Sequence, residues 1–231
     1  MKILFIGNSH TYMNDMPELV REMIENATGE TCEVFMLAYP GKTLKWHMAE
    51  EYFSERFNIL HGGYDYCVIQ ERAHPMPPEE ETASYASRIV ELCRKAGTVP
   101  VIFETWAEKT NPENQEAVNR RYRNLAANQG VLLAPVGEIW TAAQAELQNR
   151  FGTDLYNVDG AHASAAGVWL IATVLTKVMT GKLPSPDFLK TYDFTLPGKK
   201  WIPVNENTED EVSAVSPEVA ETIRKYADAL Q

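Results

Sequence analysis

The sequence predicts an α/β protein in which a five-stranded, mainly parallel sheet lies between two layers of helices. Short apolar runs rich in Val, Ile and aromatic residues alternate with longer amphipathic segments, and Gly, Pro, Asp or Asn residues bound the runs. Alternating strands and helices imply crossover connections, which make consecutive strands parallel and put helices on both faces. We therefore expect a flavodoxin-like, three-layer α/β/α sandwich with a C-terminal extension. The five runs are residues 3–6, 33–37, 66–69, 99–103 and 131–134.

Segments with helical periodicity lie between these runs and after the last of them. The clearest helix spans residues 165–180, where apolar residues recur at helical spacing. Ser164 is placed to cap its N-terminus and Gly181 to end it. The other predicted helices span residues 18–26, 83–96, 114–129 and 217–230.

The character of the chain changes after residue 183, where prolines and a polar, acidic stretch break any long element. We expect residues 1–183 to form one domain. Residues 184–231 are expected to form a Pro-rich extension whose terminal helix packs on the same domain. Trp201 and Ile202 are the expected anchors of this extension.

Composition narrows the class of protein. The net charge of −11 makes nucleic acid and anionic membranes poor partners, because the surface field repels polyanions. Three cysteines without a CxxC spacing argue against a disulfide framework or a zinc site. The N-terminal apolar run is too short for a signal peptide or a membrane span. We expect a soluble, cytoplasmic protein without metal or cofactor, although a chain trimmed of its leader would look the same; the oligomeric state stays open.

Three polar residues stand where this fold places active sites. Open parallel sheets bind ligands outside the carboxyl ends of their strands. Ser9 follows the first run in a tight strand-to-helix turn, and Asp159 and His162 precede the helix at 165–180. A serine hydroxyl needs a base to become a nucleophile, and a carboxylate three residues before a histidine can reach its second ring nitrogen. Each residue alone fits an ordinary turn, cap or surface position; together they predict a Ser-His-Asp triad.

These segments resemble the SGNH (GDSL-like) hydrolases. The family's first block, a strand leading to Gly-Asp-Ser or Gly-Asn-Ser, matches the Gly-Asn-Ser of residues 7–9. Its last block, Asp-x-x-His before the final core helix, matches Asp-Gly-Ala-His at residues 159–162. The resemblance covers about residues 1–183. It implies an α/β/α sandwich and metal-free hydrolysis of carboxylic esters through an acyl-enzyme.

The resemblance also implies an oxyanion hole. The backbone N–H of Ser9 would supply one donor, and Gly41 looks like the glycine of the family's second block. The third block departs from the family pattern: Gly-x-Asn-Asp is usual, whereas this chain has Val-Ile-Gln-Glu-Arg at residues 68–72. Gln70 is the natural stand-in for the asparagine, with a side chain one methylene longer. A structural role for Gln70 is the alternative.

Other residues near the predicted edge are candidate substrate contacts by position alone. Trp106 is the expected aromatic wall for a sugar or acyl group. His47, in a predicted helix beside Trp46, is expected to serve packing. The candidate substrate contacts are Asn8, His10, Tyr39, Glu71, Arg72 and Trp106.

The expected activity is hydrolysis of a small-molecule or carbohydrate ester, with carbohydrate O-deacetylation as one form. Lipase, thioesterase or acyltransferase chemistry on the same triad is one alternative. A catalytically weak binding protein that retains the fold is another, supported by the altered third block.

Overall fold

The computed structural model describes residues 1–49, 51, 53–189, 191–193 and 212–230 of the chain. Its main sheet has five parallel strands in the order β2-β1-β3-β4-β5, which confirms the predicted flavodoxin-like arrangement. This order reverses direction between β1 and β3, where α/β sheets of this kind bind ligands. The strands are β1 (Lys2–Gly7), β2 (Glu33–Ala38), β3 (Tyr66–Ile69), β4 (Val99–Phe103) and β5 (Leu132–Ala134).

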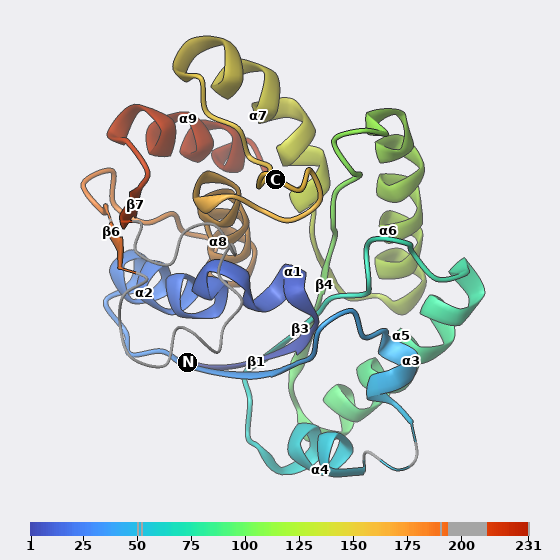
Figure 1. The fold of residues 1–231 in the computed structure, drawn as a ribbon. Coiled ribbons are helices and arrows are strands. Elements are labelled where there is room, and N and C mark those ends of the chain that lie inside the picture. The colour runs from blue at the N-terminus through green and yellow to red at the C-terminus, as the bar shows by residue number, and fades with distance from the viewer. Residues whose placement is uncertain (50, 52, 190, 194–211, 231) are drawn as a thin grey trace.

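Helices cover both faces of the sheet because successive strand residues point to opposite sides (Figure 1). In β1, Ile3 and Phe5 belong to one buried cluster, and Leu4 and Ile6 belong to the other. The first cluster packs under α2 (Met16–Thr28), α7 (Val136–Phe151), α8 (Ala165–Thr180) and α9 (Pro217–Asp228). The second packs under α3 (Leu44–His47), α4 (Phe53–His61), α5 (Glu79–Ala96) and α6 (Gln115–Gln129).

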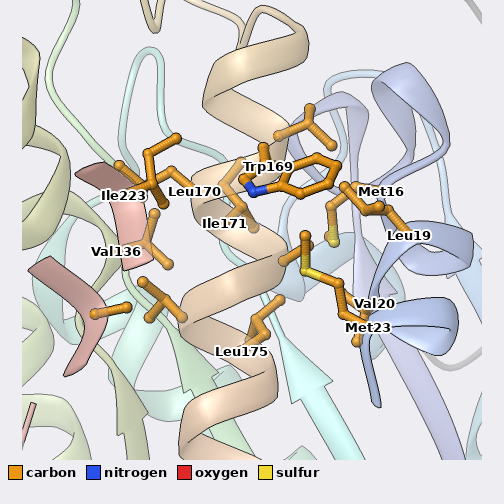
Figure 2. Close-up of a cluster of buried hydrophobic side chains, with 14 of the residues drawn as sticks. Met16, Leu19, Val20, Met23, Val136, Trp169, Leu170, Ile171, Leu175 and Ile223 are labelled. Carbon is orange, nitrogen blue, oxygen red and sulfur yellow. The ribbon is translucent and has the colours of Figure 1, made fainter. Parts of the chain in front are cut away.

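Helix α8 is the centre of the first layer. Figure 2 shows Trp169, Leu170, Ile171 and Leu175 projecting from it toward several neighbouring elements. The bounds of α8 agree with the prediction: the Ser164 hydroxyl accepts a hydrogen bond from the Gly167 amide, and Gly181 ends the helix with a left-handed φ of +71°. The apolar residues drawn around α8 include Met16, Leu19, Val20, Met23, Val136 and Ile223.

The apolar composition of the five runs is typical of buried parallel strands, but the structure shows that β2 is partly exposed. Strand β2 lies at the edge of the sheet, and its Phe35 and Met36 are 39% and 42% exposed. An edge strand lacks a neighbour on one side, so apolar composition alone does not place it in the interior.

The C-terminal part contains a two-stranded antiparallel sheet of β6 (Thr191–Asp193) and β7 (Val212–Ala214), followed by α9. Ser216 caps α9 and Pro217 occupies its first turn, and Ile223 and Ala227 are buried in the cluster around α8. The predicted anchors Trp201 and Ile202 lie outside the described residues. Within the described part of the chain, no helix has the length and apolar character needed to cross a membrane.

Candidate active site

Ser9 is the first residue of α1 (Ser9–Tyr12), in a turn that neighbouring side chains fix in place. The Asn8 carboxamide caps this helix by accepting from the His10 amide at 3.2 Å, and it donates to the Lys42 carbonyl at 3.0 Å. Gln70 Oε1 accepts from the Asn8 amide at 3.0 Å and from the Thr11 hydroxyl at 2.9 Å. Buried polar groups with partners resist rearrangement, so the Ser9 side chain is presented from a rigid turn at the end of β1.

The turn that carries Asp159 and His162 is fixed equally well. Asp159 Oδ1 accepts from the amides of Ala161 and His162, each at 2.9 Å. The Trp106 indole donates to the Ala161 carbonyl at 2.9 Å, and the Lys109 amide donates to the Gly160 carbonyl at 2.9 Å. Gly160 has a φ of +69°, a left-handed conformation that glycine adopts without a steric penalty.

These two turns bring the three predicted triad residues together. His162 Nε2 lies 2.8 Å from Ser9 Oγ, and His162 Nδ1 lies 2.5 Å from Asp159 Oδ2. Burial tends to raise the pKa of Asp159, but hydrogen bonds from the His162 ring and from the Ala161 and His162 amides outweigh it and hold the pKa below its ordinary value. Asp159 is therefore ionised at neutral pH and favours the His162 tautomer whose Nε2 accepts the Ser9 proton.

The two backbone amides predicted to form an oxyanion hole belong to the turns that follow β1 and β2. The Ser9 amide belongs to the first turn of α1, whose N–H groups have no partner within the helix. Gly41 lies in an exposed turn with a φ of +65°, and an added Cβ would meet no atom within 4 Å. The Asn8 carboxamide holds this turn against the nucleophile loop through Lys42.

Gln70 takes up a different position from the one expected of an oxyanion donor. Its side-chain nitrogen donates to the carbonyl of Glu71, and its oxygen accepts from Asn8 and Thr11. Only 1% of Gln70 is exposed. In this arrangement Gln70 supports the nucleophile turn, which is the structural alternative weighed above.

Three of the predicted substrate contacts are buried and used within the protein. Asn8 caps α1 as described above. Glu71 accepts from the amides of Leu44 and Arg72 at 3.1 and 2.7 Å, so it links the end of β3 to the start of α3. Trp106 stacks on Trp140, with ring centroids 4.1 Å apart, while its indole N–H supports the triad turn. Each of them positions the site from behind.

The other three predicted contacts differ in their distance from the triad. The His10 ring packs 4.8 Å from the His162 ring and 5.1 Å from Trp106, between centroids. Burial, followed by the neighbouring His162 and His74, holds the pKa of His10 well below its ordinary value, so His10 is an uncharged neighbour of the base. Arg72 is half-buried and donates to the Pro75 carbonyl, and Tyr39 is exposed and packs on Trp46.

The structure also brings Glu108 and Arg121 to this region, to which the sequence analysis did not assign them. They line a cavity of about 510 Å³ together with His74, whose position after the third strand made it a candidate pocket residue. Glu108 follows β4 closely, so it could have been predicted from the rule that ligands bind at the carboxyl ends of strands. Arg121 lies in the interior of α6, and its sequence position carries no such signal.

Among the residues described, no three His, Cys, Asp or Glu side chains are grouped so that they could hold a metal ion. The arrangement of Ser9, His162 and Asp159 instead suits proton transfer from a hydroxyl to an imidazole.

Known proteins resemble this chain in structure rather than in sequence. No family model matches the sequence, and no curated protein matches it either. The structure of TesA superposes with a TM-score of 0.60 at 14% identity, covering 78% of this chain and 99% of TesA. The lipase/acylhydrolase from Enterococcus faecalis gives a TM-score of 0.60 at 15% identity, over 80% and 98% of the two chains. Axe2, an acetylxylan esterase from Geobacillus stearothermophilus, gives 0.59 at 14% identity, over 78% and 94%.

The chain has the fold of the SGNH (GDSL-like) hydrolases. The superpositions cover 99% of TesA and 98% of the Enterococcus faecalis protein, so this chain contains nearly the whole fold of each. Within the SGNH fold, Ser9 follows β1 and the Asp159–His162 turn precedes α8, as the order of the family's first and last blocks requires.

Proposed function

We propose that this protein is a serine esterase that hydrolyses carboxylic esters through an acyl-enzyme. The hydrogen-bonded series from Ser9 Oγ through His162 to Asp159, with separations of 2.8 and 2.5 Å, carries the proposal. The 2.8 Å between Ser9 Oγ and His162 Nε2 lies within the range needed for a base to take a proton from the nucleophile.

The mechanism follows from the positions of these groups. As Ser9 Oγ attacks the ester carbonyl carbon, its proton passes to His162 Nε2, and Asp159 stabilises the resulting imidazolium. The Ser9 and Gly41 amides donate to the oxyanion. Collapse of the tetrahedral intermediate releases the alcohol, which takes the proton from His162. Water then attacks the acyl-enzyme with His162 again as base, which frees the acid and restores Ser9.

We infer that the acyl group is small and the alcohol a carbohydrate, which makes a carbohydrate O-deacetylase the finer form of the proposal. The likeness to the acetylxylan esterase Axe2 supports this form. The lipase/acylhydrolase from Enterococcus faecalis is equally similar in fold, so lipase chemistry on longer acyl chains is the alternative to exclude.

The first test compares hydrolysis of p-nitrophenyl acetate by the wild type and by Ser9→Ala. We expect turnover by the wild type and a fall of at least ~10³-fold in Ser9→Ala, because loss of a triad member leaves only binding and the oxyanion hole. Ser54→Ala, in α4 and outside the site, is the matched control and should retain wild-type rates. Equal activity of Ser9→Ala and the wild type would refute the assignment of the nucleophile.

Two further measurements separate the alternatives. A fluorophosphonate probe should label Ser9 in the wild type, whereas a binding protein without an activated serine should not react. Butyrate and octanoate esters of p-nitrophenol should react more slowly than the acetate if the acyl site is small. A preference for octanoate would favour lipase or thioesterase chemistry instead.

A further inference from the structure

The cavity beside the triad is the strongest feature that the proposed reaction does not yet use. It lies between the loops that follow β3 and β4 and the first half of α6, and its volume is about 510 Å³. Small-molecule sites of proteins have volumes of about 300–1,000 Å³. The cavity is therefore large enough to hold a molecule of the size of a sugar.

Ring contacts connect this cavity to the catalytic base. His74 lines the cavity, and its ring centroid lies 5.4 Å from that of His10. The His10 ring in turn lies 4.8 Å from the ring of His162. An ester bound at Ser9 would therefore have the cavity beside it, on the side of His74.

The walls of the cavity carry opposite charges that are not paired with each other. Arg121 donates to the Thr82 hydroxyl at 2.5 Å, and Glu108 accepts from the Asn111 carboxamide at 3.3 Å. Over the described ranges of the chain, neither residue forms an ion pair. Asn114 adds a further polar side chain, and Met76 and Val118 add apolar surface.

Arg121 is also held in position from behind. The Thr82 hydroxyl, which accepts from Arg121, donates to Glu71 Oε2 at 3.2 Å. Glu71 in turn binds the amides of Leu44 and Arg72, so the cavity wall is joined to the segment that follows Gly41. A guanidinium fixed in this way loses less rotamer freedom when it binds a ligand.

We propose that this cavity binds the alcohol part of the ester, a sugar ring whose hydroxyl groups accept from Arg121 and donate to Glu108. This inference rests on the proposed esterase function and adds the residues that select its substrate. A hydroxyl both donates and accepts, so neighbouring hydroxyls of one ring can bridge a cation and a carboxylate. Met76 and Val118 offer apolar surface to the C–H groups of the ring.

Other alcohols satisfy these walls less well. An apolar alcohol offers no partner to the remaining donors of Arg121 or to the remaining acceptor sites of Glu108, which costs binding free energy. An alcohol that bears a carboxylate pairs with Arg121 but meets like charge at Glu108. His74 does not add a positive charge, because burial holds its pKa below the ordinary value.

The test compares two acetate esters that share the acyl group and differ in the alcohol. One is p-nitrophenyl acetate, and the other is a methyl xylopyranoside with one acetylated and two free hydroxyls. The readout is the ratio of kcat/KM for the sugar ester to kcat/KM for the p-nitrophenyl ester. We expect Arg121→Gln and Glu108→Gln each to lower this ratio at least tenfold, mainly through KM.

Matched control positions lie on α6, the helix that carries Arg121. Arg120→Gln and Glu116→Gln remove equal charges from exposed positions that do not line the cavity, and they should leave the ratio within twofold of the wild type. Arg121→Lys, which keeps the charge but loses the planar fork, should fall between wild type and Arg121→Gln. Thermal melting checks that each variant is folded.

The outcomes separate this inference from the proposed function. If the wild type hydrolyses neither ester at Ser9, the esterase proposal fails. If it hydrolyses both and the ratio does not respond to Arg121→Gln or Glu108→Gln, the cavity inference fails alone. If Glu108→Gln raises the ratio while Arg121→Gln lowers it, Glu108 does not receive a sugar hydroxyl and the proposed ring-binding mode is overturned.

Discussion

His47 and Glu55 form a buried polar pair directly behind the nucleophile turn. His47 Nε2 lies 2.8 Å from the carbonyl oxygen of Gly7, and its Nδ1 lies 2.7 Å from Glu55 Oε2. The side chains are 0% and 4% exposed. The Gly7 carbonyl only accepts, so Nε2 carries a proton. The peptide between Gly7 and Asn8 is thus held at its oxygen by His47 and by the Tyr39 amide at 3.1 Å, and at its N–H by Gln70.

We expect His47 to position Ser9, although the sequence analysis assigned it to packing. Replacing His47 by Leu together with Glu55→Gln removes the side-chain donor to Gly7 and leaves only the Tyr39 amide there, without leaving a buried carboxylate unpaired. We expect kcat to fall by up to ~10²-fold with a smaller change in KM. His47→Gln retains a donor of similar reach and should recover most of kcat. Steady-state kinetics beside thermal melting gives both readouts.

The control for this pair is His61→Gln, an exposed histidine at the end of α4. It should leave kcat unchanged. If the double variant melts at a lower temperature but keeps kcat, His47 serves stability alone and its positioning role is wrong.

The contacts of His162 with Ser9 and Asp159 could be predicted from sequence, whereas most of the residues that support them could not. Ser9, Asp159 and His162 stand in short local patterns whose meaning depends on a few neighbours. The contacts of Gln70, Glu71 and Trp106 instead join segments far apart in the chain, such as Trp106 with Ala161. Position at the end of a strand indicated that these side chains lie near the site, but not whether they face the substrate or the interior.

At the scale of elements, helix α8 approaches its neighbours closely because of one glycine. A Cβ built on Gly167 would lie 2.3 Å from the Leu155 carbonyl oxygen and 2.7 Å from the Trp140 ring. The backbone after Leu155 leads into the turn with Asp159 and His162. This close approach therefore joins the packing of α8 to the geometry of the triad.

Gly167→Ala should lower both stability and activity. We expect a loss of ~1–3 kcal/mol in the free energy of unfolding, as for overpacked cores, and a fall in kcat from displacement of the triad turn. Ala165→Gly in the same helix turn should cost ~1 kcal/mol through helix propensity while kcat is retained. Urea unfolding and p-nitrophenyl acetate kinetics measure the two effects. Unchanged kcat in Gly167→Ala would show that the triad turn does not depend on this packing.

Elements differed in how well their sequences predicted them. Helix α8 has a capping serine, a long apolar pattern and a terminal glycine, and its bounds were predicted. Helix α7 was not predicted, although Val136, Ile139, Trp140 and Ala143 follow helical spacing. Its glycine at 137 looks unfavourable for a first turn, but a Cβ there would lie 2.2 Å from the Thr105 carbonyl oxygen. The tertiary contact that explains this residue is absent from local sequence.

For the whole molecule, the order of strands and the layers of helices followed from alternation alone, because parallel crossovers permit few arrangements. The edge position of β2 could not be predicted in this way, because β1 and β2 are both rich in apolar residues and the sequence does not show how many neighbouring strands each one has. Net charge predicts that polyanions are poor partners, but it does not show that titratable groups lie inside the protein. Glu104, at the end of β4, is one such group and is fully buried.

Glu104 should make the stability of the whole molecule depend on pH. Burial, reinforced by the nearby carboxylate of Glu138 and opposed by Arg123, raises the pKa of Glu104 from 4.5 to about 9. Below pH 4.5 the carboxyl is protonated in both the folded and the unfolded chain. Between pH 4.5 and 9 only the unfolded chain releases the proton, so this residue lowers the free energy of unfolding by at most ~1.4 kcal/mol per pH unit as pH rises.

Glu104→Gln removes this dependence and keeps a neutral side chain of similar shape beside Asn119. We expect the variant to lose less stability than the wild type between pH 5 and pH 8, by more than ~1 kcal/mol in urea unfolding. Its advantage should be greatest at pH 8 and smallest at pH 5, because the folded wild type is penalised only where the free carboxyl ionises. Glu116→Gln, on the exposed side of α6, should follow the wild-type profile. If the Glu104→Gln and wild-type profiles run parallel, Glu104 ionises equally in both states and is not held neutral by burial.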